Sequence, residues 1–165
     1  MILRVGSVTS YWLAHSTEVS ELRKSFEKIE RGSTVLAAFN GRADTGVFHW
    51  FSLSYAVLDR HIFTPALYPD IHMLSVKPDY KRLTRLVATP VELSLLPTPG
   101  VDHRAAGEVN DYWSTWWKDF SYLLVLSRKP IEPVFNDHLS MVAEGSYFRL
   151  YKIRQSAAQQ TPATR

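Results

Sequence analysis

The sequence predicts an α/β fold, in which a small, mainly parallel sheet carries helices packed on it in a Rossmann-like layering. Apolar residues recur at helical spacing between Ser10 and Glu30. Two short apolar runs, Thr34–Phe39 and Tyr122–Ser127, are typical of strands covered on both faces. Helical and extended segments alternate along a chain of 165 residues, 45% of them hydrophobic. We therefore expect a single domain over residues 1–154.

The first helix is predicted from Ser10 to Glu30. Its apolar residues follow one another at spacings of seven, three, four and three, which places them on one helical face: Trp12, Val19, Leu22, Phe26 and Ile29. Gly32 comes after the last of them and predicts a helix C-cap. The run Thr34–Phe39 then predicts the first strand.

The middle of the chain predicts less regular structure. We expect a second helix between Gly46 and Leu58 and a strand at Ile71–Val76. Four prolines between Lys77 and Gly100 favour loop. A third helix is expected to begin at Asn110 or Asp111, either of which can cap it.

The C-terminal part predicts two strands and a helix. Tyr122–Ser127 is the clearest buried strand. Asn136 or Asp137 is expected to cap a short helix that reaches Glu144. Tyr147–Arg154 mixes charged and apolar residues, as an edge strand does. Residues 155–165 are mostly small and polar, and we expect them to form a disordered tail.

Composition narrows the classes of function. The net charge of +3 is small, and its densest basic window, Lys77–Arg85, is typical of a solvated face, so no nucleic-acid partner is expected. The absence of cysteine excludes disulfides and thiolate zinc sites. The longest uncharged runs, Val5–Thr17 and Thr45–Leu58, are shorter than the ~20 residues that a membrane span needs. No signal peptide is expected.

A ligand site is predicted at the carboxyl edge of the sheet, where parallel strands gather their loops. The loop after Thr34–Phe39 contains two glycines, and the residue after Ser127 brings a further charge to the same edge. The candidate ligand-binding residues are Asn40, Gly41, Arg42, Asp44, Gly46 and Arg128. They suit an anionic or hydroxyl-rich ligand. The alternative is a plain turn, because the glycine spacing matches no phosphate-binding loop.

No catalytic residue, cofactor or metal ligand is assigned from the sequence. Six histidines are present, but they form neither an H-x-H nor an H-E-x-x-H metal-binding motif. A site built from histidine and carboxylate stays open as an alternative. No G-x-S-x-G elbow is present, and nothing nominates a base or an oxyanion hole.

Aromatic residues concentrate in the third predicted helix. They could form a stacking or sugar-binding face, or anchor at a membrane interface. The alternative is that large rings pack onto the sheet. We expect Trp113 and Trp117 to do so, with Trp116 and Tyr112 nearer the rim.

Several phrases of the sequence together resemble a known group of proteins. The chain resembles the soluble C-terminal domain of large bacterial multi-pass membrane proteins related to lipid-linked-sugar glycosyltransferases. The resemblance covers residues 10 to 154 and depends mostly on core-pattern residues. The phrases are Glu21-Leu22, Phe26, Ile29, Gly32–Leu36, His49, Ser54–Arg60, Phe63, Pro65, Phe120–Leu126 and Gly145–Ile153.

The resemblance implies an extracytoplasmic domain at the periplasmic face of the inner membrane. Catalytic acids of such enzymes lie in their transmembrane part, so no catalytic residue carries over to this chain. We therefore expect a non-catalytic domain that covers the membrane site, or binds a glycan, a lipid-linked sugar or a partner protein, beside the transmembrane region of its parent protein. The alternative is a free-standing cytoplasmic α/β protein that binds or processes a small phosphorylated ligand.

Overall fold

The computed structural model describes residues 2–41, 53–65, 76–83, 91–99, 113–127 and 137–154. Five strands form one sheet in the order β2-β1-β3-β5-β4. The strands are β1 (Val35–Phe39), β2 (Val91–Glu92), β3 (Tyr122–Leu126), β4 (Leu139–Glu144) and β5 (Phe148–Ile153). The helices are α1 (Ile2–Phe26), α3 (Leu53–Arg60) and α4 (Trp116–Asp119), with 3-10 turns η1 (Pro78–Leu83), η2 (Leu93–Leu95) and η4 (Trp113–Thr115). Helices and a sheet in one chain confirm the α/β class.

The strands β1 and β3 form the centre of the sheet. They pair in parallel, from Val35 opposite Tyr122 to Phe39 opposite Leu126. Every residue of both strands is buried, which confirms the prediction of strands covered on both faces. The other edge of β1 is covered first by Phe63, whose carbonyl accepts from the Val35 N–H at 2.8 Å, and then by β2.

The prediction of a mainly parallel sheet is wrong. β2, β1 and β3 pair in parallel, but β5 is antiparallel to both β3 and β4, so the sheet is mixed. The tight turn at Gly145–Tyr147 accounts for the antiparallel pairing of β4 with β5, because so short a connection can only return the chain antiparallel. With half of the pairings antiparallel, these elements do not establish a Rossmann-like layering.

The position of the last strand also differs from the prediction. β5 lies between β3 and β4 and is not an edge strand. Its apolar residues enter the cores on the two faces, while the charged side chains of Arg149 and Lys152 pair with Glu144 and Glu30. Charged residues in a strand can therefore mark ion pairs across a sheet face as well as an edge.

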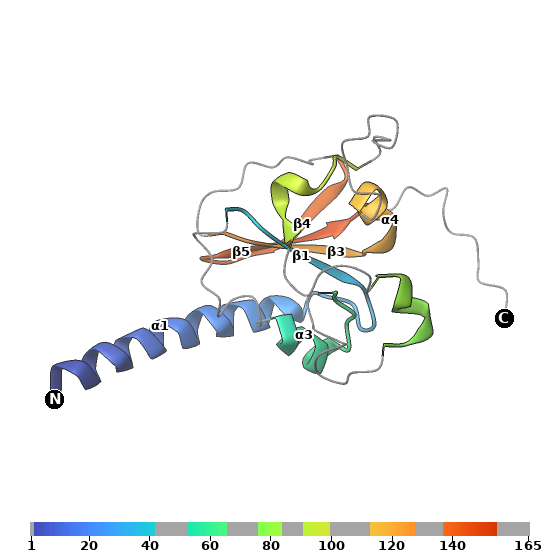
Figure 1. Cartoon of the computed structure of the whole chain (residues 1–165). Coiled ribbons are helices and arrows are strands. Elements are labelled where there is room, and N and C mark those ends of the chain that lie inside the picture. The colour runs from blue at the N-terminus through green and yellow to red at the C-terminus, as the bar shows by residue number, and fades with distance from the viewer. Residues whose placement is uncertain are drawn as a thin grey trace.

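A layer of structure covers each face of the sheet (Figure 1). α1 and α3 pack on one face, where Leu22, Phe26 and Leu53 join Val35 and Ala37 of β1 in one core cluster. The other face packs against η2 and α4, and Leu93, Trp116 and Phe120 belong to a second core cluster there. The two central strands are thereby shielded from water on both sides.

α1 is longer at its start and shorter at its end than the predicted helix. It begins at Ile2 and ends at Phe26, after which Ile29 is still buried but lies in a turn. Backbone bonds of the 3-10 type, such as Ile29 N–H to Phe26 O at 3.0 Å, tighten this end. Gly32 has a left-handed φ of 76°, as expected of a helix C-cap. It does not directly follow the helix, however, but lies in the turn that leads from α1 to β1.

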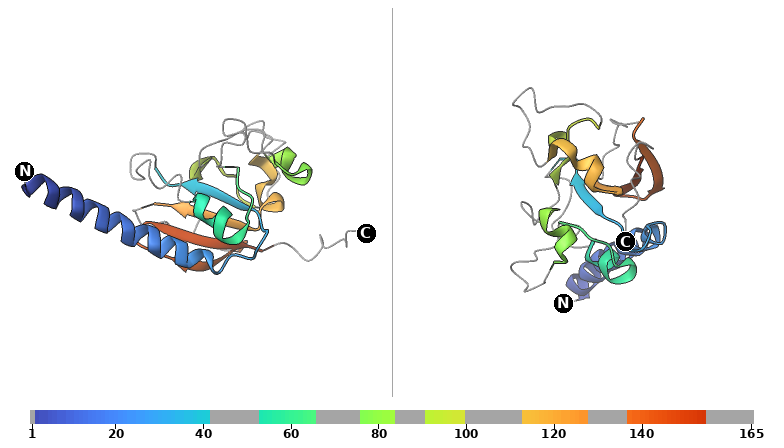
Figure 2. Two further views of the ribbon diagram at one scale, coloured as in Figure 1. Left: turned by 90° about the horizontal axis from the view of Figure 1, so that it is seen from below. Right: turned by 90° about the vertical axis from the view of Figure 1, so that its right-hand side faces the viewer.

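The first part of α1 projects past the sheet, as both views show (Figures 1 and 2). Leu22 is the first fully buried side chain described on this helix, and Leu13 is 64% exposed. Although α1 has 25 residues, no helix in the described part of the chain is both long and apolar enough to cross a bilayer.

The short helix predicted between Asn136 or Asp137 and Glu144 is wrong. Residues 137–138 form a turn, and Leu139–Glu144 is the edge strand β4. The segment is extended because Leu139–Glu144 pairs antiparallel with β5, a long-range pairing that outweighs the local capping signal. A bulge interrupts β4 at Val142, whose carbonyl accepts from the Lys28 ammonium at 2.7 Å.

Several predictions fall partly or wholly on residues that the structure does not describe. α3 confirms a helix in the second predicted segment, but residues 46–52 lie outside the described ranges. So do residues 71–75 of the predicted strand, the predicted caps Asn110 and Asp111, and the tail 155–165.

Leu124→Asp is expected to abolish cooperative unfolding. Leu124 is 1% exposed and lies between Ala37 of β1 and Leu150 of β5. An unpaired carboxylate there costs several kcal/mol, against a total stability of about 5–15 kcal/mol. Circular dichroism during heating measures the transition. Met141→Asp, at a position 56% exposed on β4, is the matched control and should unfold much as the parent does. Equal melting of the two variants would contradict the burial of β3.

Gly145→Ala is expected to destabilise the chain by about 1–3 kcal/mol through overpacking. A Cβ at this position would overlap the ring of Phe148, which is buried and cannot swing away. Denaturant unfolding measures the loss. In a Phe148→Leu background the ring atoms are gone, so the same substitution should cost clearly less. An equal cost in both backgrounds would show that the ring is not the obstacle.

Candidate functional site

The carboxyl edge of β1 and β3 brings together part of the predicted ligand site. The Asn40 N–H donates to the Leu126 carbonyl at 3.1 Å, and the Ser127 N–H donates to the Tyr147 carbonyl at 2.8 Å. Gly41 follows with a left-handed φ of 81°, a conformation that favours glycine. The ends of the two strands therefore meet at one edge, as expected of a parallel pair.

The remaining residues of that predicted site cannot be placed. Arg42, Asp44, Gly46 and Arg128 lie outside the described residues, so ligand binding at this edge stays a prediction. Glu92, which was not among the predicted site residues, pairs with Phe39 at the end of β2 and is exposed at the same edge.

The tryptophan cluster differs from the prediction. Trp116, expected near the rim, is fully buried, and its indole N–H donates to the Pro97 carbonyl at 2.9 Å. Trp117, expected against the sheet, is only partly buried and meets Trp116 edge-on, with ring centroids 6.3 Å apart. The reason is that a 3-10 turn precedes α4, so helical spacing does not hold across the segment. The side chains of Tyr112 and Trp113 are outside the described set.

A second candidate site is a groove of about 630 Å³ between α1 and α3. Its walls are mostly polar, with Val19 and Phe26 as apolar members. The charged residues that line it are Arg23, Lys24, Glu27, Asp59 and Arg60. Three basic and two acidic groups make the groove slightly positive. A smaller hollow of about 330 Å³ lies beside it along α1, lined by Ser16, Thr17, Ser20, Glu21 and Lys24.

An arginine–carboxylate pair joins the two walls of the groove. Arg23 of α1 donates from Nε and Nη2 to the two carboxylate oxygens of Asp59 on α3, both at 3.0 Å. The Arg23 guanidinium also lies over the Tyr55 ring, 4.9 Å from its centroid. Arg23 is 48% exposed, so the pair keeps hydrogen-bonding capacity toward solvent. Bidentate geometry of this kind fixes the orientation of both groups.

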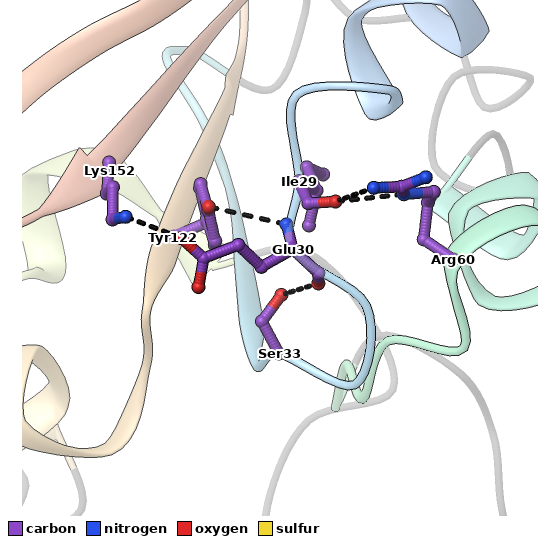
Figure 3. A network of polar contacts seen from close by, with 6 residues as sticks. All are labelled: Ile29, Glu30, Ser33, Arg60, Tyr122 and Lys152. Atoms are coloured by element: carbon purple, nitrogen blue, oxygen red, sulfur yellow. Dashed lines mark hydrogen bonds and ion pairs between the residues drawn. The ribbon is translucent and has the colours of Figure 1, made fainter.

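Arg60 holds the turn after α1 against the end of α3 (Figure 3). Its Nε and Nη2 both donate to the Ile29 carbonyl, at 2.9 and 2.7 Å. The Gly32 N–H in turn donates to the Arg60 carbonyl at 3.1 Å. These bonds set the distance between the two helices and therefore the width of the groove.

The same turn is fastened to the sheet through Glu30 (Figure 3). The Lys152 ammonium on β5 donates to Glu30 Oε1 at 2.6 Å, and the Glu30 N–H reaches the Tyr122 hydroxyl at 3.4 Å. The hydrogen bond to Lys152 and its positive charge lower the pKa of Glu30. The hydrogen bond to Glu30 likewise raises the pKa of Lys152.

Among the described residues, no histidine lines the groove or the hollow beside it. His15 lies 3.4 Å from Glu18 on α1, whereas His61 and His138 belong to other segments. Across the described part of the chain, no group of three or more His, Cys, Asp or Glu residues is arranged to hold a metal ion.

Comparisons with family models, with curated proteins and with solved structures find no match to this chain. The resemblance to the soluble domains of membrane glycosyltransferase-like proteins therefore stays a prediction.

The groove was not predicted from the sequence. Arg23 and Asp59 are 36 positions apart, and nothing in the local pattern of either helix joins them. The one usable signal was the Asp59-Arg60 pair at the end of a predicted helix, where two opposite charges adjoin.

The Glu30–Lys152 pair predicts a pH dependence of stability. Because the pKa of Glu30 is lowered by folding, its contribution is present above the ordinary glutamate pKa of about 4.3 and is lost as the pH falls through the lowered value. Because the pKa of Lys152 is raised, the contribution persists through neutral and mildly basic pH. Melting temperatures of Glu30→Gln and the parent should differ at pH 7 and converge in acid. A constant difference across that range would contradict the pairing, and Lys152→Met, which removes the other partner, should behave as Glu30→Gln does.

Proposed function

We propose that this chain is a non-catalytic recognition domain that binds a glycan or the sugar-phosphate head group of a lipid-linked sugar for a membrane glycosyltransferase. The ligand would lie in the groove between α1 and α3. The observation that carries this proposal is the Arg23–Asp59 pair across that groove, beside the exposed ring of Tyr55.

The chemistry of the groove suits a hydroxyl-rich ligand. Its volume of about 630 Å³ falls within the range of small-molecule sites. Most of its lining residues are polar and the paired Arg23 and Asp59 are partly exposed, so a bound ligand would keep much of its contact with water. Sugar hydroxyls both donate and accept hydrogen bonds, and can therefore use the Asp59 carboxylate and the Arg23 guanidinium at once.

The slight positive balance of the groove favours an anionic group on the ligand. Asp59 already neutralises Arg23, and Lys24 and Arg60 then stand against the single acid Glu27. Arginine and lysine both bind phosphate, arginine through two parallel hydrogen bonds. A sugar that carries a phosphate would satisfy both parts of the groove.

The resemblance to membrane glycosyltransferase-like proteins supports the same assignment. Phe26, Asp59 and Arg60 belong to the phrases on which that resemblance depends, and all three line the groove. A periplasmic location beside a membrane would place such a groove where lipid-linked sugars and their acceptors occur.

Titration of the ¹⁵N-labelled chain with polyprenyl-phosphate head groups and short glycans tests the proposal by NMR. We expect shifts at Ser20, Arg23, Asp59 and Arg60, with a Kd in the range of about 0.1–10 mM for a head group alone. Arg23→Gln and Asp59→Asn should each weaken binding about tenfold, which corresponds to loss of a charge-assisted hydrogen bond. Arg154→Gln, an exposed arginine at the end of β5, is the matched control and should bind normally.

Two results would overturn the assignment. No shift with any ligand up to about 10 mM would remove sugar recognition as the function of the groove. Shifts confined to Asn40 and Gly41, with the groove unaffected, would move the site to the carboxyl edge of the sheet. Binding of a small phosphorylated metabolite at that edge would favour the free-standing α/β protein instead.

A further inference from the structure

The strand β4 lies at one edge of the sheet and directs part of its backbone outward. The Arg154 N–H donates to the His138 carbonyl at 2.8 Å, so the backbone groups of His138 point toward β5. Because this direction alternates along an antiparallel ladder, the N–H and C=O groups of Leu139 and Met141 point away from β5. Within the ranges that the structure describes, no hydrogen bond reaches these outward groups.

Only the second half of β4 is protected against pairing with another strand. Edge strands are usually protected by charges, prolines or bulges. In β4 the bulge is at Val142, whose carbonyl already accepts from the Lys28 ammonium. Residues 139–141 are Leu, Ser and Met, without charge or proline. Met141 is 56% exposed although it is a large apolar side chain, so the first half of β4 is open to a partner strand.

We propose that residues 139–141 of β4 pair antiparallel with the same residues of a second copy of this chain, so that the two sheets join edge to edge. In this pair, Ser140 lies level with the partner's Ser140, and Leu139 lies opposite the partner's Met141. Both of the opposed residues direct their backbone outward, so they exchange both of their N–H···O bonds. This inference is independent of the ligand proposed for the groove.

A second copy suits this edge because the open stretch is short and ends at a bulge. A long regular strand would lose its register at Val142. In an antiparallel pair of β4 strands, the two bulges instead lie at opposite ends, outside the paired residues. The same register covers the exposed Met141 with the partner's Leu139. Both side chains lie on the face of the sheet that carries α4, since Leu139 packs against the second core cluster.

The contact is small, so we expect a weak and transient pair. Three residues of a strand span about 10 Å. The area that they bury is below the roughly 1,600 Å² of a standard interface. We therefore expect a Kd of about 0.1–1 mM.

Disulfide cross-linking of the full chain tests the register, because the chain contains no cysteine of its own. The Cα atoms of the two Ser140 residues would lie about 4.5 Å apart, which a disulfide can bridge. The two Met141 residues would lie about 7–8 Å apart, too far for a disulfide without backbone movement. Ser140→Cys should therefore cross-link about fivefold faster than Met141→Cys, although Met141 is the more exposed residue. Equal or faster cross-linking of Met141→Cys would overturn this register.

Sedimentation from about 10 µM to 2 mM measures the association itself. The parent should pass from monomer to dimer. Met141→Lys places a charge on the open edge and should weaken association about tenfold. Leu58→Lys is the matched control, because it makes the same substitution at a 72% exposed position on α3 and should associate as the parent does.

Circular dichroism during heating checks that both lysine variants keep the fold, which their exposed positions favour. A parent chain that stays monomeric at about 2 mM would overturn the pairing. A folded Met141→Lys chain that dimerises as well as the parent would also overturn it, because the contact would then lie elsewhere on the surface.

Discussion

The two parallel strands β1 and β3 are buried on both faces, and this constraint determines what the rest of the chain has to supply. Each face of the pair must be covered, because a backbone ladder lined with apolar side chains on both sides is stable only when shielded from water. α1 and α3 cover one face, and the segment around η2 and α4 covers the other. The groove between α1 and α3 exists because two separate helices share the first of these faces.

The turn between α1 and β1 fixes the position of α1 relative to α3 and the sheet, and so defines the groove. It is bonded to α3 through Arg60 and to the sheet through Lys152 and Tyr122. At its other end, the Thr34 hydroxyl donates to the Asp119 carbonyl at 3.0 Å, which ties β1 to the segment before β3. The helix that carries Arg23 is thus held from several sides, and a hydrogen-bonding site on it would be preorganised.

The sequence predicted those elements whose signal is local. The apolar runs at Val35–Phe39 and Tyr122–Leu126 are buried as expected, and their parallel pairing brings Asn40 and Ser127 to one edge. The helical spacing from Val19 to Phe26 also predicted the buried face of α1. In each case the residues that decide the structure lie within a few positions of one another.

The features that the sequence could not predict depend on contacts between residues that are far apart in the chain or on strand pairing. The direction of β5 follows from a three-residue turn, whereas its charged residues suggested an edge. A capping residue at Asp137 suggested a helix, but pairing with β5 outweighed it and made β4. The groove is formed by Arg23 and Asp59, which only the packing of α1 on α3 brings together.

The separation between the paired strands sets the order in which the sheet can assemble. β3, β4 and β5 lie within residues 122–154, and the hairpin of β4 and β5 closes over three residues. Val35 must instead find Tyr122 across 87 positions, the difference between 122 and 35. Closure of so long a loop is entropically costly, and contacts of this kind form slowly. The three C-terminal strands therefore form the more local unit, with β5 between β3 and β4. We expect the docking of β1, together with the helix that precedes it, to be the slow event in folding.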